Sequence, residues 1–260
     1  MRAPVTEQAA ALAVEATSRA LRLPTVREQA GSLAEAALRD RLSHLAYLAE
    51  LLSAELEDRE ARRRERRTAE ARFPRLKHLA DFDLAAAPTV DPALLAALER
   101  CEWVERGEPV VLLGDSGTGK SHLLIGLGLA ACQRGLRVRY TTAAQLVNEL
   151  AEASDERVLS RVIARYGRLD LLCLDELGYL QLDRRGAELL FQVLTEREER
   201  ASVAVASNAP FSEWGQTFAD PRLAAAVVDR LTFRAHIIET GSESYRLRVT
   251  SAAKGGASTT

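Results

Sequence analysis

The sequence predicts an α/β fold, a five-stranded parallel sheet between helices, preceded by a small all-helical N-terminal domain. Two observations lead to this prediction. After residue 109, short apolar runs alternate with longer segments of helical periodicity, which is typical of a parallel sheet covered on both faces. Before residue 100 the chain contains an alanine-rich, helix-prone segment and leucines at helical spacing.

The elements of the α/β part can be placed from their patterns. Apolar runs bounded by polar or turn residues predict strands at 110–113, 137–140, 169–174, 202–207 and 235–239. Amphipathic segments between them predict helices at 121–133, 143–153, 156–166 and 185–200. An alanine-rich segment before Asp229 predicts a further helix.

The N-terminal part reads as helices with a basic segment. We predict one helix over 9–21, broken by Pro24, and another over 33–56. The second rests on leucines at helical spacing, namely Leu38, Leu42, Leu45, Leu48, Leu52 and Leu56. From Arg59 to Lys77 nine basic residues accompany three acidic ones, and Pro74 ends this helix.

These patterns divide the chain into three parts. We expect a helical N-terminal domain over 1–75, an α/β domain over 76–250 and a disordered Gly/Ser/Thr-rich tail over 251–260.

Composition excludes several function classes. The net charge of −2 over 260 residues indicates no general polyanion binder. The three cysteines, Cys101, Cys132 and Cys173, have no disulfide or metal-ligand spacing, and the four histidines are scattered. No long apolar run or signal-peptide pattern is present, so we expect a cytoplasmic protein without a membrane partner.

The most specific motif lies between the first strand and the helix after it. It matches G-x-x-x-x-G-K-[ST], the phosphate-binding loop (P-loop). Its glycines allow backbone N–H groups to face phosphate oxygens, Lys120 can reach the β- and γ-phosphates, and Ser121 can bind Mg²⁺. The alternative is a glycine-rich strand-to-helix turn. The predicted nucleotide contacts are Gly114, Asp115, Ser116, Gly117, Thr118, Gly119, Lys120, Ser121 and His122.

Two acids end the third predicted strand. Asp175 and Glu176 follow an apolar run 55 residues after Lys120, at the sheet edge where ligands bind in parallel sheets. We expect Asp175 to hold the hydration shell of Mg²⁺ with Ser121, and Glu176 to polarise the attacking water. The alternative is a pair of solvated acids at the start of a loop.

Two further residues could complete this chemistry. Asn208 ends the fourth predicted strand, where its amide could orient water or contact the γ-phosphate, or simply begin a turn before Pro210. Arg230 follows the alanine-rich helix. It is either a solvated side chain or a guanidinium that neutralises γ-phosphate charge in a neighbouring subunit.

A predicted basic stripe offers a DNA contact. Arg157, Arg161 and Arg165 recur every four residues in the predicted helix 156–166, a spacing that suits a phosphate backbone. The alternatives are a solvated face paired with nearby acids, and a DNA site in the N-terminal basic run 62–67.

Several segments together resemble one family. Over residues 20–248 the sequence is similar to the IstB-like ATP-binding proteins, helper ATPases of insertion-sequence transposition that belong with DnaA and DnaC to the AAA+ ATPases. Besides the P-loop, the segments that carry the resemblance are 71–74, 79–83, 175–180, 190–192, 207–215, 229–231 and 244–246. Asp-Glu-Leu-Gly-Tyr and Glu-Trp-Gly within them are more family-specific than a P-loop.

The resemblance implies further roles. It implies an AAA+ P-loop NTPase core using ATP and Mg²⁺, with Asn208 as sensor 1, Arg230 as a trans-acting arginine finger and Arg246 as a sensor-2 arginine. It also implies homo-oligomers, as rings or helical assemblies, on duplex DNA, and partnership with a transposase. The chain departs from many relatives at Asp115 and Ser116, where they carry proline, and has serine rather than threonine at Ser121. Both departures keep the required chemistry.

Two rival functions remain. A DnaC-like replicative helicase loader would share the ATPase core and differ in what its N-terminal segment binds. A nucleotide-gated DNA-binding scaffold would hydrolyse little ATP, and the intact Lys120, Asp175 and Glu176 argue against it.

Overall fold

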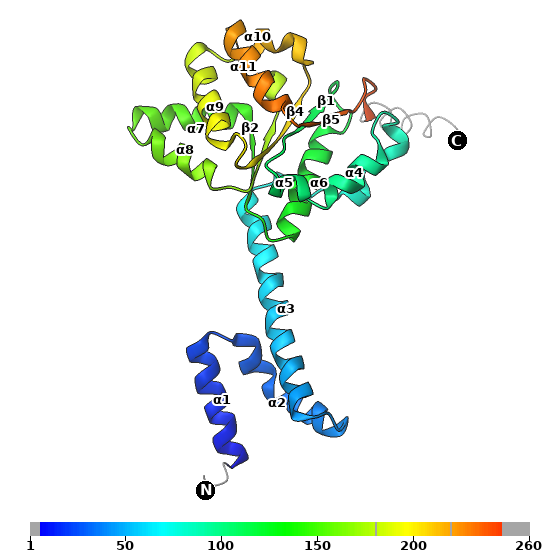
Figure 1. The fold of residues 1–260 in the computed structure, drawn as a ribbon, viewed down its shortest axis with the longest axis vertical. Helices are drawn as coiled ribbons and strands as arrows, with labels where there is room; N and C mark the ends of the chain where they lie inside the picture. Colours follow the sequence, from blue (N-terminus) through cyan, green and yellow to red (C-terminus); the bar gives the residue numbers. More distant parts are fainter. Residues whose placement is uncertain (1–5, 180, 219, 246–260) are drawn as a thin grey trace, which may run out of the picture. The chain divides into compact units, whose positions relative to one another are not determined.

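The computed structural model describes residues 6–179, 181–218 and 220–245. The chain divides into two compact units, residues 1–64 and 65–260 (Figure 1). Among the helices of the described residues, none is both long and apolar enough to cross a membrane.

The N-terminal unit is helical, as predicted. It comprises α1 (Glu7–Leu21), α2 (Pro24–Arg39) and the first part of α3 (His44–Ala71). Pro24 separates α1 from α2 and occupies the first turn of α2, where its missing N–H costs no hydrogen bond.

The predicted helix over 33–56 is wrong in one respect. The chain breaks at Arg41, which has a left-handed φ of 54°, and Ser43 then accepts the N–H of Ala46 at the start of α3. The break separates α2 from α3.

The core of this unit is small. Val26, Ala30 and Leu51 form it, while the carboxylate of Glu55 accepts the N–H groups of Thr25 and Val26 at 2.8 and 3.1 Å. The leucines that predicted the helix lie elsewhere: Leu38, Leu42, Leu45, Leu48, Leu52 and Leu56 are all exposed. The face of α3 that packs against α2 within this unit is therefore not the leucine-rich one.

The second unit contains the predicted parallel sheet. Its strands are β1 (Val110–Leu113), β2 (Val138–Thr142), β3 (Leu171–Asp175), β4 (Ser202–Ser207) and β5 (His236–Glu239). They pair in the order β2-β3-β4-β1-β5, and all pairs are parallel. The sequence placed all five strands within two residues of their observed ends.

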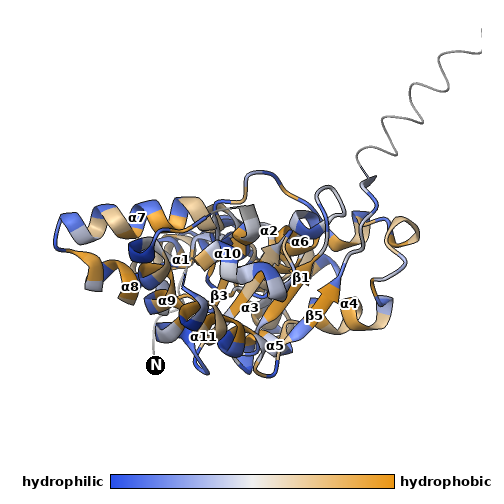
Figure 2. Cartoon of the chain, turned by 90° about the horizontal axis from the view of Figure 1, so that it is seen from above, coloured by the Kyte–Doolittle hydropathy of each residue, from blue (hydrophilic) through white to orange (hydrophobic). Residues whose placement is uncertain are grey.

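Side chains alternate between two apolar layers on either side of the sheet. Val110 and Leu112 pack in the layer that contains α6 (Lys120–Gln133) and α4 (Pro92–Glu99). Val111 and Leu113 pack in the layer on the opposite face. That layer contains α7 (Ala143–Asp155), α9 (Arg184–Arg197), α10 (Trp214–Phe218) and α11 (Pro221–Thr232). Figure 2 shows hydrophobic strands such as β1 and β5 between the helices.

The remaining elements are short. They are α5 (Glu102–Glu105), α8 (Leu159–Gly167) and the 3₁₀ turns η1 (Leu79–Asp81), η2 (Leu84–Ala86), η3 (Leu177–Tyr179) and η4 (Phe211–Glu213). The helix predicted over 156–166 begins later than expected, because Arg157 has a φ of 62° in the turn between α7 and α8.

A buried arginine joins the amino ends of β3 and β4. Arg197 is 1% exposed, and its terminal nitrogens donate to the carbonyls of Tyr166, Leu169 at 3.1 Å, Asp170 at 3.4 Å and Ser202 at 2.6 Å. Burial lowers the pKa of Arg197 to about 10. The guanidinium thus satisfies carbonyls of the α8–β3 turn and of β4 at once.

We predict that Arg197→Met destabilises the protein by about 3 kcal/mol, because the variant keeps most of the volume but leaves several buried carbonyls without donors. Thermal unfolding measures the effect. Arg200→Met is the control, since that side chain is 76% exposed and its ion pair with Glu196 spans 3.9 Å. Equal melting temperatures for the two variants would show that the hydrogen bonds of Arg197 to these carbonyls do not stabilise the fold.

Candidate nucleotide-binding site

The P-loop follows β1 and turns directly into α6, as predicted. Gly117 and Gly119 have φ values of 85° and 100°, which side chains rarely adopt. A Cβ at Gly119 would also lie 2.7 Å from the ring of Phe82. Glycine is therefore required there both by the backbone and by the contact.

Internal hydrogen bonds hold the loop. The Lys120 ammonium is largely buried and donates to the carbonyl of Asp115 at 2.7 Å. The hydroxyls of Thr118 and Thr240 lie 2.6 Å apart, and Thr240 donates to the carbonyl of Leu113 at 3.1 Å. Lys120 thus lies folded back over its own loop.

A hollow of about 350 Å³ opens beside the loop. Six of the nine predicted nucleotide contacts line it, namely Gly117, Thr118, Gly119, Lys120, Ser121 and His122. Gly114, Asp115 and Ser116 belong to the same loop but are not among its lining residues. The hollow is large enough for part of a nucleotide.

The opposite wall comes from a segment that the sequence indicated only as a connector. Arg75, Lys77, Asp81, Phe82 and Asp83 line the hollow. The Phe82 ring meets His122 edge-on, with ring centroids 5.4 Å apart.

Two glycines inside α6 allow this segment to lie close. A Cβ at Gly126 would lie 2.6 Å from Leu79, and one at Gly128 would lie 2.9 Å from Phe73. Glycine is unfavourable inside a helix, so the pair was the available signal of a close approach.

The end of the described chain crosses the P-loop. The N–H of Asp115 donates to the carbonyl of Gly241 at 3.0 Å, and the N–H of Tyr245 donates to the carbonyl of Gly117 at 3.1 Å. Tyr245 also lines the hollow. The predicted sensor-2 residue Arg246 lies outside the described residues.

Asp175 and Glu176 lie at the carboxyl end of β3, as predicted. Asp175 is 4% exposed, and its two carboxylate oxygens accept the Tyr140 hydroxyl at 2.6 Å and the Glu176 N–H at 2.9 Å. Burial, and then the Asp175 carboxylate, raise the pKa of Tyr140, which keeps the phenol protonated as a donor.

Glu176 is exposed and has a left-handed φ of 61°. Such a conformation is costly for a residue other than glycine and is concentrated at functional sites. It turns the chain sharply between Asp175 and η3.

Asn208 follows β4, the neighbour of β3. Its Oδ1 atom is buried and has no hydrogen-bond partner within the described part of the chain. Gly178 packs directly against it, and a Cβ on that glycine would lie 2.7 Å from the Ala209 nitrogen. The structure thus brings a buried, unpaired acceptor close to the turn that follows Glu176.

The predicted magnesium residues have the chemistry that Mg²⁺ requires. The cation takes oxygen ligands and keeps several waters, so one hydroxyl and one carboxylate suffice beside the phosphates. Ser121 lines the hollow and Asp175 ends β3 on the sheet face that α6 covers. The described residues contain no group of three or more His, Cys, Asp or Glu side chains able to hold a metal alone.

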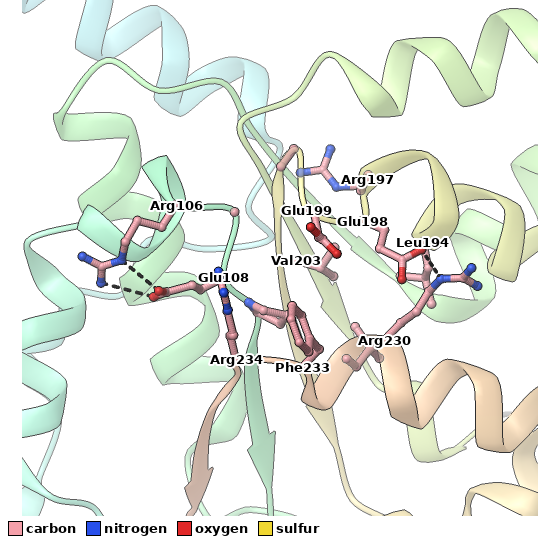
Figure 3. Close-up of a pocket in the computed structure, with 14 residues that line it drawn as sticks. Arg106, Glu108, Leu194, Arg197, Glu198, Glu199, Val203, Arg230, Phe233 and Arg234 are labelled. Carbon is pink, nitrogen blue, oxygen red and sulfur yellow. Dashed lines mark hydrogen bonds and ion pairs between the residues drawn. The ribbon is translucent and has the colours of Figure 1, made fainter.

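Arg230 lies at the other end of the sheet. It lines a pocket beside Gly107, Glu108 and Pro109, which precede β1, whereas the P-loop follows β1 (Figure 3). Its Nε donates to Glu198 at 2.6 Å, and its guanidinium lies 4.1 Å from the centroid of the Phe191 ring. The structure therefore does not bring Arg230 to the P-loop of its own chain.

The predicted arginine stripe is only partly formed. Arg161 and Arg165 are exposed one turn apart on α8, but Arg157 precedes this helix. Arg165 pairs with Glu149 and lies 5.3 Å from the Tyr166 ring centroid.

Comparison with known proteins agrees with this geometry. The profile of the family described as IstB-like ATP binding protein matches residues 16–253. The chain belongs to this family. It is 39% identical over 235 residues to an insertion-sequence ATP-binding protein of Sinorhizobium fredii, covering 90% of this chain and 79% of the relative. It is 36% identical over 228 residues to that of insertion sequence IS5376 of Geobacillus stearothermophilus, covering 88% and 91%.

Solved structures confirm the predicted AAA+ fold of this IstB-like protein. AMPPCP-bound DnaA from Aquifex aeolicus has a TM-score of 0.52 at 20% identity, and the match covers 71% of this chain but only 56% of DnaA. A DNA replication initiation factor has a TM-score of 0.53 at 21% identity, covering 69% of this chain and 54% of that one. The chain thus spans just over half the length of these two proteins.

Proposed function

We propose that the protein is an AAA+ ATPase that hydrolyses ATP, assembles on duplex DNA and assists a transposase in insertion-sequence transposition. The observation that carries the proposal is the placement of the P-loop hollow, Asp175, Glu176 and Asn208 at the carboxyl edge of one sheet. The names of the family and its insertion-sequence relatives support the ATP and transposition parts.

In this proposal each group of site residues has a separate role in ATP hydrolysis. P-loop N–H groups and Lys120, once it leaves the Asp115 carbonyl, bind the phosphates, and Phe82 and Tyr245 offer aromatic surfaces for the base. Mg²⁺, when bound through Ser121 and Asp175, supplies charge neutralisation on the β- and γ-phosphates. Glu176 takes a proton from the attacking water.

The rival functions fit less well. DnaI resembles the fold with a TM-score of 0.50 at 19% identity, which supports shared architecture and not a shared partner. The relatives named above belong to insertion sequences, which favours the transposition role over helicase loading. The buried Lys120 and Asp175 and the strained Glu176 favour turnover over a passive scaffold.

Glu176→Gln should bind ATP normally and hydrolyse it at least about 100-fold more slowly, because an amide is a far weaker proton acceptor than a carboxylate. Lys120→Ala should instead lose ATP binding. Equilibrium binding and phosphate release distinguish the two effects. Turnover by Glu176→Gln at the parent rate would exclude Glu176 as the base.

Arg230 supports a shared active site. Its position at the amino edge of the sheet prevents it from serving its own P-loop, while a neighbouring subunit could receive it. The side chain is 21% exposed, and its Nη1 atom is buried without a partner among the described residues. We infer that Glu198 and Phe191 hold Arg230 until a neighbour's γ-phosphate replaces them.

Arg230→Ala should therefore bind ATP normally and hydrolyse it at least about a thousandfold more slowly. Mixing it with Glu176→Gln should restore part of the activity, since an intact site from one variant then receives an intact arginine from the other. Phosphate release across mixing ratios measures the recovery. No recovery at any ratio would contradict a shared site.

The proposed DNA surface centres on α8. Arg165 lines a hollow of about 490 Å³ at the β2 edge. Six arginines and two glutamates line this hollow: Arg67, Arg72, Arg137, Arg139, Arg165, Arg168, Glu70 and Glu149. A local excess of positive charge on a chain of net charge −2 suits a phosphate backbone. Arg161 is exposed one turn before Arg165 on α8, and Arg157 is exposed in the turn before this helix.

Replacing Arg157, Arg161 and Arg165 by alanine should weaken binding to random duplex DNA. The slope of the logarithm of the binding constant against the logarithm of salt concentration should become shallower by up to about three. Fluorescence anisotropy at several salt concentrations measures both. ATPase activity without DNA should be unchanged. Arg139→Ala/Arg168→Ala tests the hollow separately, and unchanged affinity in both variants would direct attention to the N-terminal basic run.

A further inference from the structure

We propose that Tyr140 is a positioning residue for magnesium: its hydroxyl fixes the carboxylate of Asp175 in the orientation that receives the hydrated cation. The inference rests on the proposed ATPase function and adds a residue from β2 to it. The sequence indicated Tyr140 only as part of a strand.

Sheet register brings the two side chains together. Tyr140 pairs with Cys173, and Asp175 lies two residues further along β3, so both project from the same face. That face is covered by α6, the helix that carries Ser121. The phenol extends toward the carboxyl end of the sheet and donates to Oδ2 of Asp175 at 2.6 Å.

The carboxylate is held at both oxygens. Oδ1 accepts the Glu176 N–H at 2.9 Å while Oδ2 accepts the phenol, so the group cannot rotate without breaking one bond. A carboxylate oxygen can accept more than one hydrogen bond, so lone pairs remain for waters of the cation. Outer hydrogen bonds of this kind set the orientation and affinity of metal ligands.

The phenol ring is itself held in place. Its centroid lies 6.1 Å from that of Phe73, with the rings inclined at 57°. The Phe73 ring packs against α6 at Gly128, which leaves space for it because it has no side chain. A Cβ at Gly128 would lie 2.9 Å from the Phe73 ring and 3.0 Å from the Cys173 sulfur. The packing of Phe73 against α6 therefore limits the movement of Tyr140.

A purely structural role makes a different prediction. A half-buried phenol needs an acceptor, and any acceptor would satisfy it. In that case loss of the hydroxyl changes stability alone. If Tyr140 positions Asp175, its loss changes the magnesium requirement while nucleotide contacts through the P-loop stay intact.

The test is Tyr140→Phe in the full-length protein, with a fluorescent ATP analogue as the probe. Affinity is measured in EDTA and across a Mg²⁺ titration. We expect affinity in EDTA within twofold of the parent and a Mg²⁺ concentration at half-maximal enhancement about tenfold higher. An unchanged Mg²⁺ requirement overturns the proposal, and so does an equal loss of affinity with and without Mg²⁺.

The chain supplies a matched control. Tyr166 is also a buried phenol, and it donates to Glu149 at 2.5 Å, away from the P-loop hollow. Tyr166→Phe should leave the Mg²⁺ requirement unchanged, and a shift equal to that of Tyr140→Phe overturns the proposal.

A second variant tests the proposal if Tyr140→Phe is not stable enough to measure. If Tyr140→Phe does not fold, Phe73→Leu loosens the ring and should raise the Mg²⁺ requirement in the same direction, whereas no change overturns the proposal. If the parent protein itself binds no ATP analogue, the proposed function fails, and this outcome differs from every outcome above.

Discussion

The parallel pairing of β1 between β4 and β5 is the constraint on which the rest of the structure depends. A strand with neighbours on both sides and helices over both faces can carry only apolar side chains, and Val110–Leu113 is such a run. Polar groups are then confined to its ends. Because every strand runs the same way, the P-loop, Asp175 and Asn208 all emerge at one edge of the sheet.

This constraint explains why the sheet and the main site could be predicted from the sequence. Short apolar runs bounded by turn residues favour buried strands, and a P-loop is recognised from its local spacing between such a strand and a helix. Helix ends were predicted less well, for a reason visible in this chain. Left-handed residues that follow helices are usually glycine or asparagine, but here Arg22, Arg41, Arg72 and Arg157 take these conformations. An arginine does not indicate a left-handed conformation, so the break at Arg41 and the late start of α8 could not be predicted from the sequence.

The unpredicted part of the site depends on contacts between distant segments. Phe82 faces the P-loop because Gly119, Gly126 and Gly128 let the preceding segment approach α6, and no local pattern encodes that approach. Tyr140 likewise matches an ordinary strand residue until the register of β2 and β3 is known. The sequence specifies which residues can do the chemistry, and packing decides which of them meet.

The same packing leaves the proposed active site incomplete in one chain. Arg230 is separated from its own P-loop by the length of the strands, and it pairs with the carboxylate of Glu198 beside the ring of Phe191. A γ-phosphate carries more negative charge than one carboxylate and offers several acceptor oxygens, so a nucleotide-loaded neighbour can compete for the guanidinium. The Nη1 atom of Arg230 is buried and has no partner among the residues that the structure describes, so moving to a phosphate would satisfy it and favours this exchange. Under the proposed function, assembly then depends on bound ATP because the partner for Arg230 is the nucleotide itself, and hydrolysis removes the charge that draws Arg230 away from Glu198.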